Sequence, residues 1–244
     1  MRAKSPSTLA FLRRISTPDD GAFRVCPIPG CGRPPQARAG RGASLIHCDR
    51  CCRRRNRHGD LVKKTYSAAE LRPYLIAVKR FIKAHPKDFH LKESGRRLAL
   101  LLEFAGPSQR IADFPNLRPS QKAQAVLARM RGKGVPSTKL LEIGLAVSAA
   151  VLDDPIRPIG TPGEYKIVQI AKRALRQASG YHSVYGPNNA YHRYPRSGGE
   201  LLRCLGTLIE EACEPASRHL TRILKLKRDS FGSVSISPLP GSLT

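Results

Sequence analysis

Four cysteines near the start of the chain have the spacing of a metal-binding site. They form two close pairs, Cys26 with Cys31 and Cys48 with Cys51, separated by a mid-length loop. A tetrahedral zinc site suits this pattern, because the loop can fold back so that four thiolates meet about 2.3 Å from the ion. Residues 25–61 contain few core-forming side chains. We therefore expect structural Zn²⁺ to supply folding free energy in this segment.

The fourth ligand is open to alternatives, because Cys52 directly follows Cys51. Cys48 and Cys52 would share one face of a helix, whereas Cys48 and Cys51 form the tighter C-x2-C pair. We favour Cys51 on this ground. His47 and His58 are the nearest histidines that could replace a thiolate.

The cysteine segment ends in Arg57-His58-Gly59-Asp60. It resembles a small zinc module of phage and bacterial mobile-element proteins, which reads C-x4-C, a loop, C-x2-C or C-x2-H, and then a basic helix ending in Arg-His-Gly-Asp or Arg-His-Gly-x. This chain has Cys51 where relatives often carry His. Such modules occur beside homing-nuclease-like and other DNA-directed domains, so the resemblance implies a nucleic-acid context without fixing an activity. It does not extend to residues 65–244.

Cationic side chains are most concentrated next to the second cysteine pair. Planar guanidinium groups suit phosphate oxygens and guanine edges, so this run predicts contact with nucleic acid, although a solvated helix face would also explain it. The predicted contact residues here are Arg50, Arg53, Arg54, Arg55, Arg57, Lys63 and Lys64. A second basic stripe lies on a predicted helix, opposite the apolar face of that helix, and consists of Lys166, Arg173 and Arg176, with Lys172 alongside. This stripe could follow another stretch of the phosphate backbone of a nucleic acid.

The charge of the whole chain favours a polyanionic partner. There are 43 Lys and Arg against 18 Asp and Glu, which gives a net charge of +25 at pH 7. A positive field of this size attracts nucleic acid. No stretch reaches the roughly 20 apolar residues of a membrane span. Seven cysteines without a secretory signal indicate the reducing cytoplasm, with nucleoid association if the source is bacterial.

Catalytic motifs are weak in this sequence, and we assign no catalytic residue. An HNH-type nuclease needs a base histidine beside a metal-binding pair, and His47, Asn56 and His58 stand in an unconvincing order. The pair His219 and Arg222 has the spacing found in tyrosine recombinases, but no tyrosine follows to act as the nucleophile. Acidic residues are too scattered for two-metal nuclease chemistry.

Most of the remaining chain has helical periodicity. Ser67 and Glu70 form a capping-box pattern ahead of apolar residues at helical spacing, and residues 137–152 are apolar on nearly every side, as in a helix at the centre of a bundle. The fold class is therefore mainly α, a helical bundle with a small N-terminal zinc module. We expect a basic tail over residues 1–20, the zinc module over 21–62 and the helical domain over 63–228. A Tyr-rich loop over 180–199 lies within the helical domain, and a second tail covers 229–244.

Together these features predict a zinc-stabilised nucleic-acid-binding protein of mobile-element or regulatory type, with DNA favoured over RNA. An HNH-like nuclease or recombinase accessory is the main alternative. A protein-interaction module, in which charge serves solubility, is the other.

Overall fold

The computed structural model describes six segments of the chain: residues 25–35, 46–107, 114–178, 180–183, 190–193 and 198–232. Only the backbone is described for residues 180–183 and 190–193. The predicted tail over residues 1–20 lies outside these six segments, as does most of the predicted tail over 229–244. The chain divides into two compact units, Met1–Arg55 and Asn56–Thr244. Sequence reasoning placed this division after residue 62, whereas it falls inside a helix. Each unit is described by itself below.

The described part of the first unit consists of a turn over residues 25–35 and the beginning of helix α2, Asp49–His58. The turn is closed by two backbone hydrogen bonds, from Cys26 N–H to the Arg33 carbonyl (2.7 Å) and from Cys31 N–H to the Ile28 carbonyl (3.0 Å). Glycine occupies the left-handed φ values of +72° at Gly30 and +58° at Gly32, which other residues rarely adopt.

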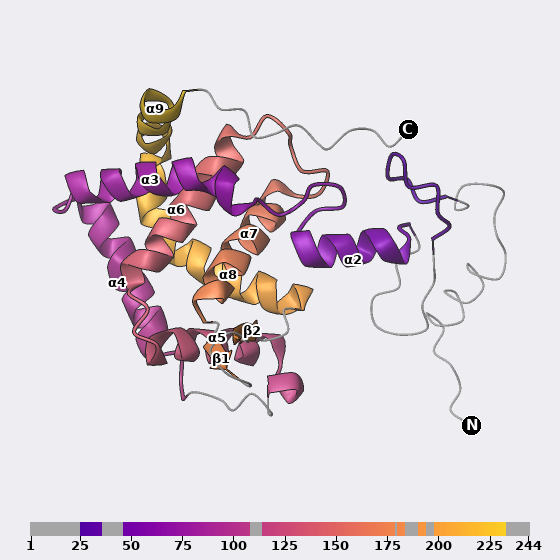
Figure 1. Cartoon of the computed structure of the whole chain (residues 1–244), viewed down its shortest axis with the longest axis horizontal. Coiled ribbons are helices and arrows are strands. Elements are labelled where there is room, and N and C mark those ends of the chain that lie inside the picture. Colours follow the sequence, from indigo (N-terminus) through magenta and orange to yellow (C-terminus); the bar gives the residue numbers. More distant parts are fainter. Residues whose placement is uncertain are drawn as a thin grey trace, which may run out of the picture. The chain divides into compact units, whose positions relative to one another are not determined.

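The second unit is built almost entirely of helices, so the predicted mainly α fold class is confirmed (Figure 1). After α2 come α3 Ala68–Ala84, α4 Phe89–Glu103, η1 Phe114–Asn116, α5 Pro119–Gly132, α6 Ser137–Asp153, α7 Pro162–Gln177, α8 Gly199–Cys213, η2 Glu214–His219 and α9 Leu220–Phe231. None of the helices in the described segments is long and apolar enough to cross a membrane.

Local sequence explains where these helices begin. The capping box predicted at α3 is present, because Glu70 N–H donates to Ser67 Oγ (3.2 Å) and Ser67 N–H donates to Glu70 Oε2 (2.5 Å). Asp88 caps α4 by accepting from Leu91 N–H at 2.9 Å. Helices α5 and α7 each carry proline in the first turn, where its missing N–H costs nothing.

Helix α6 lies at the centre of the second unit, as its apolar sequence predicts. It packs against α3, α4, α7, α8 and α9, and nine of its 17 residues are buried. Helices α7 and α8 meet closely because Gly206 has no side chain. A Cβ atom there would lie only 2.1 Å from the Ile167 carbonyl oxygen. This contact holds α7 against the core and so fixes the face that α7 exposes.

The Tyr-rich loop predicted over residues 180–199 contains regular structure. Strands β1 Gly180–Ser183 and β2 Ala190–Arg193 pair antiparallel, with Gly180 opposite Arg193 and Ser183 opposite Ala190. The expectation of an irregular loop therefore missed a short hairpin, since four-residue strands give too little alternation to be recognised.

Candidate metal centre and basic surfaces

Cys26, Cys31, Cys48 and Cys51 come together in the first unit. Their sulfur atoms all lie within 4.8 Å of one another, and Cys31 Sγ is 3.4 Å from Cys48 Sγ and 3.5 Å from Cys51 Sγ. Four sulfurs placed about 2.3 Å from a central ion would be about 3.8 Å apart, so the cluster is close to a tetrahedral ligand set. The four cysteines can hold a metal ion.

Two local structures position the sulfurs. The turn over residues 25–35 supplies the first pair, and the start of α2 supplies the second, with Cys48 directly before the helix and Cys51 in its first turn. Cys26, Cys48 and Cys51 are each at most 5% exposed. Three of the four sulfur ligands are thus shielded from water, and Cys31 is half-buried.

The protonation of these thiols also fits a cation. Burial tends to raise the pKa of Cys48, but hydrogen bonds from the Cys51 backbone and the other three thiols outweigh it and lower the pKa to about 7. Burial and the neighbouring sulfurs raise the pKa of Cys51, and burial raises that of Cys31. A divalent cation bound to the four sulfurs would stabilise them as thiolates and release their protons.

Cys52 and His47 are placed apart from the four sulfurs. The thiol of Cys52 points to the His47 carbonyl oxygen, 3.8 Å away, and neither residue belongs to the group of converging ligand atoms. The C-x2-C spacing favoured Cys51 over Cys52, and the Cys51 sulfur is the one that lies among the four. The difference arises because adjacent helical residues point about 100° apart.

The part of α2 in the first unit carries Arg50, Arg53, Arg54 and Arg55. Arg50, Arg53 and Arg55 are exposed, whereas Arg54 is half-buried. Arg53 Nε lies 2.8 Å from the Asp49 carboxylate, but its side chain remains 66% exposed. Asp49 is the one acidic residue of the helix, so most of the arginine charge on α2 is not balanced within the helix.

In the second unit, the Arg-His-Gly-Asp segment has a structural role. Gly59 has φ of +79°, and a Cβ atom there would lie 2.9 Å from Val168 Cβ and 3.0 Å from the Glu164 carbonyl oxygen. Asp60 is fully buried and accepts hydrogen bonds from the backbone of Val62 (2.8 Å), Lys63 (2.5 Å) and Gly160 (3.0 Å). The segment therefore lets the chain turn tightly against α7.

His58 takes part in the same arrangement. Its Nδ1 atom is 2.8 Å from Thr65 Oγ1 and accepts from Thr65 N–H at 3.2 Å. An accepting Nδ1 leaves the proton on Nε2. His58 is not among the converging metal ligands, so the alternative of a histidine in the metal centre finds no geometric support.

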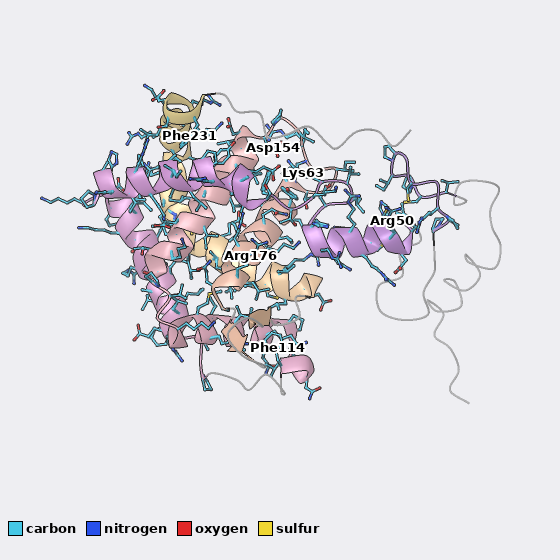
Figure 2. All side chains as sticks on the ribbon, viewed as in Figure 1. Arg50, Lys63, Phe114, Asp154, Arg176 and Phe231 are labelled. Atoms are coloured by element: carbon cyan, nitrogen blue, oxygen red, sulfur yellow. The ribbon has the colours of Figure 1, made fainter. Side chains whose placement is uncertain are left out.

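Lys63 does not belong to an exposed basic surface, contrary to the sequence prediction. It is 8% exposed, and its Nζ forms an ion pair with Asp154 and donates to the Ile156 carbonyl at 2.6 Å (Figure 2). Tyr66 Oη also donates to Asp154, at 2.6 Å. Because the lysine charge is buried and paired, Lys63 is removed from the set of expected phosphate contacts.

The stripe predicted on α7 is also revised. Lys166 forms an ion pair with Glu210, so its charge is compensated. Arg173 is half-buried and donates to the Ser67 carbonyl at 2.8 Å, whereas Arg176 is exposed.

Two further lysines differ in their exposure. Lys64, which was predicted with the first basic run, is exposed. Lys172, which sequence reasoning set beside the stripe, is half-buried and donates to Thr65 Oγ1 at 2.7 Å.

The residues considered for catalysis have structural partners. His219 is 5% exposed and lies 3.1 Å from the Asp88 carboxylate. Asn56 Oδ1 accepts from Arg203 at 3.4 Å. These contacts join neighbouring segments of the second unit and do not assemble a nucleophile with a base.

Comparison with known proteins places the chain in no family. A scan of protein-family models, a search of curated proteins and a search of solved structures each found no match. The functional argument therefore depends on the geometry and charge described above.

Proposed function

We propose that this protein binds nucleic acid through arginines on a helix whose start is held by a structural zinc ion. DNA is the favoured partner, in a mobile-element or regulatory setting. The observation that carries the proposal is the composition of α2, which begins within the second cysteine pair and contains five arginines and one acidic residue.

The metal and the arginines support one another in this proposal. Cys48 lies directly before α2 and Cys51 lies in its first turn, where Arg50 is exposed, and Arg53 and Arg55 are exposed in the turn that follows. An ion bound to those sulfurs would hold the helix start in one orientation. Fixed guanidinium groups lose less conformational entropy on contact with phosphate than mobile ones do.

Zinc is the metal we assign to the centre. Four thiolates in a near-tetrahedral arrangement are typical of structural zinc, and such a closed site has no position left for a catalytic water. The site needs reduced cysteines, which favours a reducing compartment such as the cytosol.

A direct binding measurement tests the proposal. The full zinc-loaded chain is titrated into fluorescently labelled duplex DNA, single-stranded DNA and duplex RNA of equal length, and anisotropy is recorded at several salt concentrations. We expect saturable binding that weakens as salt rises, with duplex DNA bound most tightly.

The same samples distinguish the alternatives. Absence of binding to all three nucleic acids at low salt would contradict the proposal and favour a protein-interaction module. Reproducible nicking of plasmid DNA with added Mg²⁺ or Mn²⁺, abolished by His47→Ala or His58→Ala, would instead favour the nuclease.

A further inference from the structure

The exposed face of α7 continues into a cluster of cations that includes the end of α2. Arg57 comes from α2, and Lys172, Arg173 and Arg176 come from the second half of α7, all within the second unit. From Lys166 to Gln177 the helix has no acidic residue. The acidic residue at its start, Glu164, is paired with Arg203.

The contacts of the central cations orient them without neutralising them. Lys172 Nζ donates to Thr65 Oγ1 (2.7 Å), and Arg173 donates to the Ser67 carbonyl (2.8 Å), both uncharged oxygens. The Thr65 hydroxyl in turn lies 2.8 Å from His58 Nδ1. Thr65 can therefore accept from Lys172 while it donates to His58, which fixes the position of the ammonium group.

Like charges act on one another across this cluster. Burial, followed by the guanidinium groups of Arg57 and Arg176, lowers the pKa of Lys172 to about 8. Burial and Arg176 also lower the pKa of Arg173. Repulsion of this kind destabilises the protein when no anion is bound, and an anion placed among the cations would remove it.

We propose that Arg57, Lys172, Arg173 and Arg176 form a phosphate seat, which binds a phosphate group of a nucleic-acid backbone. Lys172 provides a half-buried charge at the centre of the seat, and the guanidinium groups around it can donate to the remaining phosphate oxygens. The inference depends on the proposed function for the identity of the ligand. It adds a binding site in the second unit that is separate from Arg50, Arg53 and Arg55.

The first part of the test compares two variants of the full zinc-loaded chain on duplex DNA. Lys172→Met with Arg176→Gln removes two charges of the seat, and Lys83→Gln with Lys87→Gln removes two exposed charges elsewhere. We expect the seat variant to weaken binding several-fold and to reduce the slope of log affinity against log salt by about 0.9, the value for one neutralised phosphate. The control pair should leave this slope within error of the unmodified chain.

The second part tests the seat without nucleic acid. An amine-reactive reagent is applied at pH 8 with inorganic phosphate or with chloride at equal ionic strength, and labelling of Lys172 and of exposed Lys64 is compared by mass spectrometry. Phosphate should slow the labelling of Lys172 several-fold and leave Lys64 unchanged.

The outcomes separate the two proposals. Binding to DNA with an unchanged slope in the seat variant overturns the seat, whether or not phosphate protects Lys172, and leaves the proposed function standing. Protection of Lys172 without any DNA binding supports an anion seat and contradicts the proposed function. Absence of DNA binding together with no protection of Lys172 by phosphate overturns both proposals.

Discussion

At the residue scale, the metal centre depends on which of two adjacent thiols turns toward Cys31. The Cys51 sulfur is 3.5 Å from the Cys31 sulfur, whereas the Cys52 sulfur faces the His47 carbonyl. The two side chains are chemically identical and differ only in their direction from α2. They therefore form a matched pair for mutagenesis.

Substitution of these thiols should have opposite results. We expect Cys51→Ser to lose the bound metal, because a serine hydroxyl is a poor replacement for a buried thiolate, and Cys52→Ser to keep one zinc ion per chain. Elemental analysis of the two purified proteins measures this. Full metal content in Cys51→Ser, together with loss in Cys52→Ser, would reverse the ligand assignment.

Sequence reasoning at this scale worked where local spacing decides the outcome. The two cysteine pairs could be identified because each lies within a short segment. Lys63 was misplaced because its burial depends on Asp154, distant in the sequence. The role of Gly59 was also not predictable, since it depends on a close approach to Val168 of α7.

At the element scale, the packing of α7 against α8 should tolerate no side chain at Gly206. A Cβ atom would lie 2.1 Å from the Ile167 carbonyl and 2.6 Å from Ile167 Cγ2, so the helices must separate to accept it. We expect Gly206→Ala to lower the free energy of unfolding by about 3 kcal/mol or more, at the high end of overpacking effects.

Gly95 in α4 is the matched control, because a Cβ atom there would meet no atom within 4 Å beyond its chain neighbours and the backbone of its own helix. Gly95→Ala should raise the free energy of unfolding by about 0.5–1 kcal/mol through helix propensity. Urea denaturation followed by circular dichroism measures both values. Equal stability of the two variants would contradict the close approach of α7 and α8.

The packing contact between α6 and α9 depends on Asp153. It accepts from Lys227 Nζ (2.8 Å), Arg228 (2.9 Å) and Tyr74 Oη (2.9 Å), and Lys227 is 1% exposed. Burial tends to raise the pKa of Asp153, but these hydrogen bonds outweigh it and lower the pKa below its usual value.

This lowered pKa predicts a pH dependence. The stabilisation from ionised Asp153 is fully present above about pH 4 and is lost as the pH falls through the folded-state pKa. Asp153→Asn removes a carboxylate charge that pairs with buried Lys227, so we expect a loss of about 3 kcal/mol at pH 7 and a shallower fall of stability in acid.

Asp229→Asn is the control for this prediction, because it removes an exposed carboxylate from the same helix as Lys227. Chemical denaturation at a series of pH values provides the comparison. A pH profile of Asp153→Asn parallel to that of the unmodified chain would show that Asp153 contributes nothing to acid stability.

Most helices could be predicted at this scale because their signals are local. The capping box at Ser67 and the apolar sequence of α6 each identified a helix correctly. The sequence does not show where the 3-10 helix η2 gives way to the α-helix α9 at Leu220. The choice between these two helix types depends on packing against α4, which the sequence does not reveal.

At the scale of the whole molecule, the metal ligands and the helical core belong to different units. All four cysteines of the metal centre lie in Met1–Arg55, and the core helices α3–α9 lie in Asn56–Thr244. The apolar side chains of α6 and its neighbours stabilise the second unit without a metal. Removal of the metal should therefore affect the two units differently.

Chelation is expected to unfold the first unit alone. The far-ultraviolet circular dichroism should fall only by the contribution of α2, and trypsin should cut rapidly after Arg50, Arg53 and Arg55. The main urea transition should keep its midpoint, and added zinc should restore protection from trypsin. Collapse of the whole helical signal on chelation would contradict the independence of the second unit.

The central claim, that the arginines of α2 contact a nucleic-acid backbone, is tested most directly by the salt dependence of binding. Affinity for one duplex DNA is measured over a range of salt for the unmodified chain and for the variant with Arg50, Arg53 and Arg55 replaced by Gln. The slope of log affinity against log salt should fall by about 0.9 for each phosphate that the variant no longer neutralises, with weaker binding on every sequence. A variant with full zinc content, unchanged affinity and an unchanged slope would contradict the account.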